Sequence, residues 1–168
     1  VSSMWCNIHG HRKKEIDDAI KRQLDKIAHT TLLGPSSIPA IELAKKLVEV
    51  APPGLKKVFY SDNGSTANEV ALKMAFQYWQ HKGYSEKTQF VALQYGYHGD
   101  TIATMGVGGI DIYHKVFQPL YFKTHFAPAP YCYRCPLGKQ DRDCTLQCLD
   151  ELENLLKDNA DCIAAMIM

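Results

Sequence analysis

The sequence predicts an α/β fold in which a mostly parallel sheet is flanked by helices. Short apolar, β-prone runs at residues 58–60, 90–94 and 162–168 alternate with stretches of helical periodicity. Strands separated by helical crossovers favour parallel pairing. Polar turns follow directly after the first two runs, and such sheets bind ligands at the carboxyl ends of their strands. Both turns are therefore candidates for a binding site.

Composition and charge exclude several classes of protein. Apolar residues make up 46% and charged residues 22%, as is ordinary for a globular protein. The net charge is +1 with Lys and Arg scattered among Asp and Glu, so no basic tract points to nucleic acid or an anionic membrane. No apolar run approaches the ~20 residues of a membrane helix, and residues 1–5 lack the features of a signal peptide. We expect a cytoplasmic protein with reduced thiols.

The first 57 residues are predicted to form mainly helices. Residues 1–11 are expected to be irregular or a short strand, and 12–28 a helix with an apolar stripe and a solvated charged face. A loop at 29–38 leads to a second helix, which Pro39 opens and Pro52-Pro53-Gly54 end. The pair His9-x-His11 could bind a metal, but we do not expect a metal site here.

The strand predicted at 58–60 leads into a polar turn and a long amphipathic helix. The turn is Ser61-Asp62-Asn63-Gly64, the helix runs from Thr66 to about Trp79, and Gly83 is placed to end it. Such a turn directs free backbone N–H groups and the Ser65 and Thr66 hydroxyls to one spot, as phosphate sites do. The alternative is that these hydroxyls only cap the helix.

The second turn, YGYHGDT at 95–101, follows the strand predicted at 90–94. His98 and Asp100 could form an acid–base pair, but residues two apart in a turn more often bond the local backbone. We interpret them as shaping the turn that presents Tyr97.

The rest of the chain is less informative about function. The glycine-rich run 105–109 matches no nucleotide-binding fingerprint. Loops around short strands are expected at 110–130, a helix from Leu146 to Leu156 and a final strand at 162–168.

Four cysteines have spacings near those of structural zinc sites: Cys132, Cys135, Cys144 and Cys148. The gap between the second and third is shorter than usual, so free thiols are favoured over a metal site.

The two turns together resemble those of the class III (fold type I) pyridoxal-phosphate aminotransferases. In that family a Gly-Ser at a helix start holds the cofactor phosphate and a Tyr-His-Gly lays its ring on the pyridine ring. The resemblance therefore implies pyridoxal 5′-phosphate as cofactor, bound by Gly64, Ser65, Thr66 and Tyr97. It implies substrate contacts from Met4, Trp5 and Tyr97, with Met4 standing where members of one branch carry Trp.

That branch works in biotin biosynthesis, and the motifs GSTANEVALKMAFQYW, YHGDT and SSMW resemble it most. It implies amination of 8-amino-7-oxononanoate to 7,8-diaminononanoate by a homodimer, with S-adenosylmethionine or lysine as amino donor and no nucleic acid or membrane partner.

The family's Schiff-base Lys and pyridine-binding Asp have no counterpart in this chain. We therefore expect no catalytic residue here, a helical segment at 1–57, and an incomplete cofactor-binding large domain at 58–168, with the chain truncated at both ends. Two alternatives are another class III enzyme acting on an ω-amino acid or diamine, and a non-catalytic fragment that binds phosphate or zinc.

Overall fold

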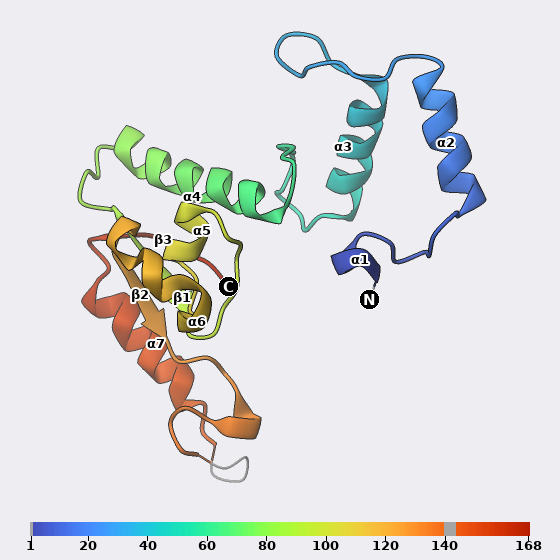
Figure 1. Cartoon of the computed structure of the whole chain (residues 1–168). Helices are drawn as coiled ribbons and strands as arrows, with labels where there is room; N and C mark the ends of the chain where they lie inside the picture. Colours follow the sequence, from blue (N-terminus) through green and yellow to red (C-terminus); the bar gives the residue numbers. More distant parts are fainter. Residues whose placement is uncertain (1, 140–143) are drawn as a thin grey trace. The chain divides into compact units, whose positions relative to one another are not determined.

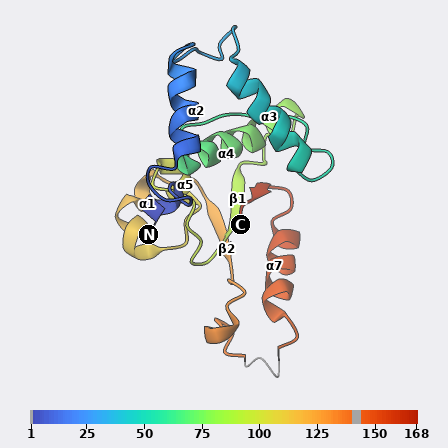
Figure 2. The same cartoon turned by 90° about the vertical axis from the view of Figure 1, so that its right-hand side faces the viewer.

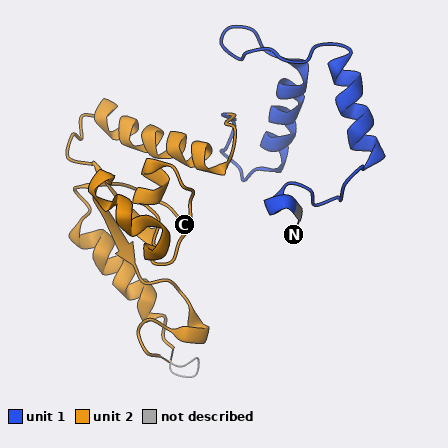
Figure 3. Ribbon diagram, in the orientation of Figure 1, with its two compact units in different colours: residues 1–59 blue, residues 60–168 orange. Residues whose placement is uncertain are grey.

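A computed structural model describes residues 2–139 and 144–168. The chain divides into two compact units, Val1–Phe59 and Tyr60–Met168 (Figure 3). The predicted division of a larger enzyme after residue 57 stays a prediction. Within the described ranges, no helix is both long and apolar enough to span a membrane.

The first unit is helical. Its elements are α1 (Ser2–Trp5), α2 (Lys14–Leu24) and α3 (Ile38–Val50). The α1 segment is a left-handed turn, since φ is positive at Ser3, Met4 and Trp5. The helices predicted around α2 and α3 are confirmed, although α2 is shorter than the expected 12–28. Ser37 begins α3 by accepting a hydrogen bond from the Ala40 N–H at 3.4 Å.

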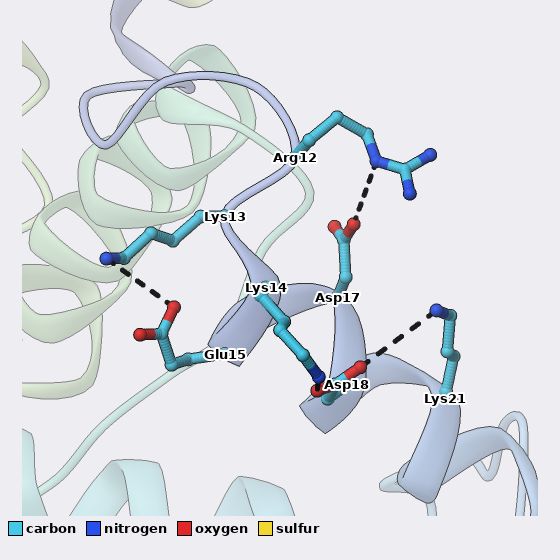
Figure 4. Close-up of polar contacts among 7 residues, drawn as sticks. All are labelled: Arg12, Lys13, Lys14, Glu15, Asp17, Asp18 and Lys21. Carbon is cyan, nitrogen blue, oxygen red and sulfur yellow. Dashed lines mark hydrogen bonds and ion pairs between the residues drawn. The ribbon is translucent and has the colours of Figure 1, made fainter.

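The charged face of α2 carries ion pairs between residues close in sequence (Figure 4). Arg12 forms an ion pair with Asp17 at 3.3 Å, and Asp18 forms ion pairs with both Lys14 and Lys21. The basic partners are more than two-thirds exposed, and exposed pairs contribute about 0–1 kcal/mol each. These pairs therefore agree with the predicted solvated face and do little to fix the fold.

The second unit contains the sheet (Figures 1 and 2). Its elements, in chain order, are α4 (Gly64–His81), β1 (Gln89–Leu93), α5 (Ile102–Gly106), α6 (Asp111–His114), η1 (Lys115–Leu120), β2 (Thr124–Ala127), η2 (Cys132–Arg134), α7 (Gln147–Asp158) and β3 (Ile163–Met166). The strand order is β2-β1-β3, and β1 pairs in parallel with both neighbours. The predicted α/β class and parallel pairing are confirmed.

The prediction of a strand at 58–60 is wrong, because the described backbone there is irregular and joins no sheet. A three-residue apolar run cannot specify a strand unless a neighbouring strand is available to pair with it. The neighbours of β1 are β2 and β3, so residues 58–60 have no place beside it. The region expected as loops and short strands contains β2 but also α6 and η1, and the preceding α5 was not predicted.

The core of this unit forms where α4 packs on the sheet. Leu72 of α4 meets Phe90 and Ala92 of β1, together with Val107 and Ala164. Val91 points to the opposite face by the alternation of a strand, and it is also fully buried. The central strand is therefore covered on both faces, as parallel sheets require.

The far end of α4 is fastened to β3. The Trp79 indole N–H donates to the Ala164 carbonyl at 2.6 Å, and the Lys87 ammonium lies 4.5 Å from the Trp79 ring centroid. Lys87 also donates to the carbonyls of Ala160 and Ile163, at 2.6 and 3.2 Å. One aromatic ring and one ammonium thus join α4, β3 and the segment that leads into β1 at this end.

Trp79→Phe should lower the free energy of unfolding by about 2 kcal/mol, because it removes a hydrogen bond and weakens the cation–π contact. Urea denaturation of the full-length protein measures this change. Tyr78→Phe is the matched control, since Tyr78 is the exposed neighbour and no hydroxyl contact of it contributes to this cluster. Equal stability of the two variants would contradict the assignment.

Candidate functional site

The N-terminus of α4 is capped by one particular pair of side chains. The Asn63 side chain accepts from the Thr66 N–H at 3.0 Å, and the Thr66 hydroxyl accepts from the Asn63 N–H at 3.2 Å. The Ser61 hydroxyl also donates to the Thr66 hydroxyl, at 2.6 Å. Of the two predicted roles for these hydroxyls, helix capping therefore describes Thr66, whose N–H and hydroxyl are both engaged.

Gly64 and Ser65 stand at the first positions of α4, where backbone N–H groups have no partner within the helix. Among the described residues, no hydrogen bond is formed by the Ser65 hydroxyl or by either N–H. The helix dipole adds positive potential at this point. An incoming anion would therefore meet two N–H donors and one hydroxyl.

The second turn lies directly against this point. Gly99 has φ of +135°, and a Cβ added there would lie 2.7 Å from Ser65 Cβ and 2.9 Å from Ser65 Cα. Such distances are too short for any side chain, so only glycine lets the two turns approach this closely. The structure thus brings Ser65 against Gly99, in the turn that also carries Tyr97, although the two turns are more than 30 positions apart in sequence.

Two hydrogen bonds hold the turns in this arrangement. The Asn68 amide donates to the His98 carbonyl at 2.8 Å, and the Ala103 N–H donates to the Glu69 carboxylate at 2.8 Å. The second bond also places a carboxylate at the start of α5, where the helix dipole favours negative charge. The sequence pattern did not single out Asn68 and Glu69. The available signal was two consecutive polar residues in the first turns of the predicted amphipathic helix.

Tyr97 presents part of its ring to solvent, with 54% of the residue exposed. Its hydroxyl donates to the Asp100 carboxylate at 2.7 Å, and this hydrogen bond raises the pKa of Tyr97. Asp100 therefore partners Tyr97, and the alternative of a His98–Asp100 pair is not formed. Asp100 does shape the turn that presents Tyr97, as predicted.

His98 is turned inward. Its Nε2 atom is buried without a partner among the described residues, and burial lowers the pKa of His98 below the ordinary 6.5. A neutral imidazole in this position fits the structural role that the sequence suggested.

The glycine-rich run after α5 lets the chain pack against the end of β1. Tyr95 has φ of +64°, and its N–H donates to the Gly109 carbonyl at 3.1 Å. A Cβ added to Gly109 would lie 2.6 Å from the Tyr95 nitrogen. The run therefore supports the turn of Tyr97 by close backbone approach.

The remaining predicted residues belong to other segments of the chain. Met4 and Trp5 belong to the first unit and are 78% and 85% exposed. Over the described ranges, which omit part of the segment between Cys135 and Cys144, no group of three or more His, Cys, Asp or Glu could hold a metal ion. The zinc alternative for the four cysteines stays a prediction.

Taken as chemistry, the site offers anion donors at Gly64 and Ser65 beside a partly open aromatic face at Tyr97. These groups fit a ligand that carries a phosphate and a flat ring. Donors for the phosphate are present at the start of α4, and the Tyr97 ring is partly exposed.

The chain matches the family of class-III aminotransferases over residues 1–168. It is 52% identical over its whole length to an adenosylmethionine-8-amino-7-oxononanoate aminotransferase of Geobacter sulfurreducens, and 53% identical over 99% of its length to one of Anoxybacillus flavithermus. It spans 37% of the length of each of these relatives.

Solved structures of similar sequence share the fold. The adenosylmethionine-8-amino-7-oxononanoate aminotransferase of Methanocaldococcus jannaschii is 45% identical, with a TM-score of 0.89 over 100% of this chain and 35% of that one. A PLP-bound amine transaminase from an uncultivated Pseudomonas species is 34% identical, with a TM-score of 0.83 over 94% of this chain and 36% of that one. The predicted fold type is confirmed.

Gly99→Ala should destabilise the protein by about 3 kcal/mol, because the new methyl group forces the two turns apart and the backbone conformation disfavours a side chain. Gly83→Ala is the control: φ there is +84°, but nothing lies within 4 Å of an added Cβ. Its cost should be about 1 kcal/mol. Thermal and urea unfolding measure both, and similar losses would contradict the close approach.

Stability should depend on pH through His98. Its pKa is lower in the folded than in the unfolded chain, so the unfolded chain binds more protons between those two values. The stabilisation is complete above 6.5 and is lost as the pH falls from there towards the folded pKa. When the pH is lowered from about 7 to about 5.5, the melting temperature of His98→Gln should therefore fall by less than that of the unchanged protein. An equal loss would show that His98 does not titrate in this way.

Proposed function

The chain belongs to the class-III aminotransferase family, and from this membership we propose that the full-length protein transfers an amino group with pyridoxal 5′-phosphate as cofactor. The observation that carries the proposal is the contact of Gly99 with Ser65, which brings the start of α4 against the turn that carries Tyr97. Bound pyridoxal phosphate supplies an electron sink for the carbon that gains or loses the amino group.

In this proposal the residues of the chain bind and orient. Gly64 and Ser65 hold the phosphate through their N–H groups and the Ser65 hydroxyl, as helix N-termini do for anions. Tyr97 supports the pyridine ring by stacking. Thr66 contributes indirectly, because its cap with Asn63 fixes the direction in which those N–H groups point. The proposal places the lysine and aspartate that complete such sites outside residues 1–168, since the chain spans 37% of the length of the relatives it matches.

The proposed reaction is amination of 8-amino-7-oxononanoate to 7,8-diaminononanoate, in the cytoplasm and by a homodimer. It is supported by relatives named adenosylmethionine-8-amino-7-oxononanoate aminotransferase that are 46–53% identical over 99–100% of the chain. S-adenosylmethionine or lysine is the proposed amino donor. Met4 and Trp5 are proposed to contact substrate, and their high exposure leaves both side chains available.

A second candidate follows from Met4, which stands where the biotin branch carries Trp. An aminotransferase for another ω-amino acid or a diamine would share the phosphate and stacking residues and differ at this position. The amine transaminase with 34% identity gives this candidate a relative in the family.

The test is product formation by the full-length protein. With 8-amino-7-oxononanoate and pyridoxal phosphate, mass spectrometry should detect 7,8-diaminononanoate with either S-adenosylmethionine or lysine as donor. Turnover of only other ω-amino acids or diamines would favour the second candidate. Absence of any amino transfer would contradict both.

Ser65→Ala should weaken pyridoxal phosphate binding by about tenfold while leaving the melting temperature of the cofactor-free protein nearly unchanged, since the Ser65 hydroxyl forms no hydrogen bond among the described residues. Thr66→Ala should instead lower stability by about 1 kcal/mol through loss of the cap. Equilibrium dialysis and thermal unfolding separate the two effects. The reverse pattern would show that Thr66, not Ser65, holds the phosphate.

A further inference from the structure

His114 is a buried imidazole that the proposed function leaves without a role. It lies at the end of α6 with only 3% of its surface exposed, and neither ring nitrogen has a partner among the described residues. A buried polar atom without a hydrogen bond costs about 1–3 kcal/mol, so a purely structural position would be better filled by an apolar side chain.

The ring of His114 is held in place by its surroundings. A Cβ added to Gly108 would lie 2.5 Å from His114 Nδ1, so the ring packs directly on the glycine backbone. The Tyr121 hydroxyl donates to the His114 carbonyl at 2.9 Å and fixes the main chain behind the ring. His114 therefore has little freedom to turn.

The face of this fixed ring is turned towards Tyr97. The two ring centroids are 6.4 Å apart and the ring planes differ by 17°, an offset-stacked arrangement. Tyr113, the neighbour of His114, meets it at 58°, so parallel alignment is particular to Tyr97. Tyr97 is thus held at its hydroxyl by Asp100 and along its ring by His114.

We propose that His114 is a positioning residue, whose flat ring sets the plane of Tyr97 and so pre-orients the surface on which the cofactor ring stacks. This inference rests on the proposed function, since it gives Tyr97 the cofactor ring as its ligand. The required property is a flat side chain behind Tyr97, and no proton transfer by the imidazole is involved.

Two variants of similar size separate a flat ring from mere bulk. In the full-length protein, His114→Phe keeps a planar face, whereas His114→Leu fills the space without one. Both remove the unpartnered nitrogens, so neither should lower the melting temperature. His114→Leu should weaken pyridoxal phosphate binding by about fivefold and reduce the visible circular dichroism of the bound cofactor. His114→Phe should leave both the affinity and the circular dichroism as they are in the unchanged protein.

A double-mutant cycle tests whether the effect passes through Tyr97. In the Tyr97→Leu background, His114→Leu should have no further effect on cofactor affinity, because the surface it orients is gone. Independent, additive losses would overturn the proposal, and so would equal affinities in His114→Phe and His114→Leu.

A readout without cofactor keeps the inference separate from the proposed function. With 3-fluorotyrosine incorporated, the ¹⁹F resonance that disappears in Tyr97→Phe reports on the ring of Tyr97. It should shift in His114→Leu and stay in place in His114→Phe. An unchanged resonance in His114→Leu would overturn the inference, whereas failure of the unchanged protein to bind pyridoxal phosphate would overturn the proposed function.

Discussion

The close contact between Gly99 and Ser65 is the constraint on which the site depends. It leaves no room for a side chain at Gly99, and it turns two short motifs into one surface. The Asn68 amide and the Glu69 carboxylate fasten the same pair of turns from within α4. The N-terminus of one helix therefore carries both its own cap and the anchor of the next turn, and it is also where we propose that the phosphate binds.

Contacts further along α4 fix the position of this helix against the sheet. Leu72 packs on Phe90 and Ala92 in the middle of the helix, and Trp79 bonds to Ala164 at its far end. Because β1 also leads into the turn of Tyr97, the position of the strand and the position of the helix start are set together. The proposed ligand surface, made mostly of backbone groups, one hydroxyl and one ring, is thus carried by a packed helix and sheet.

Much of this could be predicted from the sequence. The helical periodicity of α2, α3, α4 and α7 and the apolar runs of β1 and β3 were sufficient, because each has a strong local pattern. The strand expected at 58–60 failed because pairing in a sheet depends on distant partners. Which of Ser65 and Thr66 caps the helix could not be predicted either, since both are good capping residues and only the geometry shows that Asn63 engages Thr66. The stacking of His114 on Tyr97 joins residues of separate turns and leaves no periodic signal.

The central claim is that the turn at Ser65 and the turn at Tyr97 together bind one cofactor. A crystal structure of the full-length protein with pyridoxal phosphate tests it most directly. The account predicts the phosphate within hydrogen-bonding distance of the Ser65 hydroxyl and the Gly64 and Ser65 N–H groups, with the pyridine ring stacked on Tyr97. A phosphate bound away from the start of α4, or a ring that does not meet Tyr97, would contradict it.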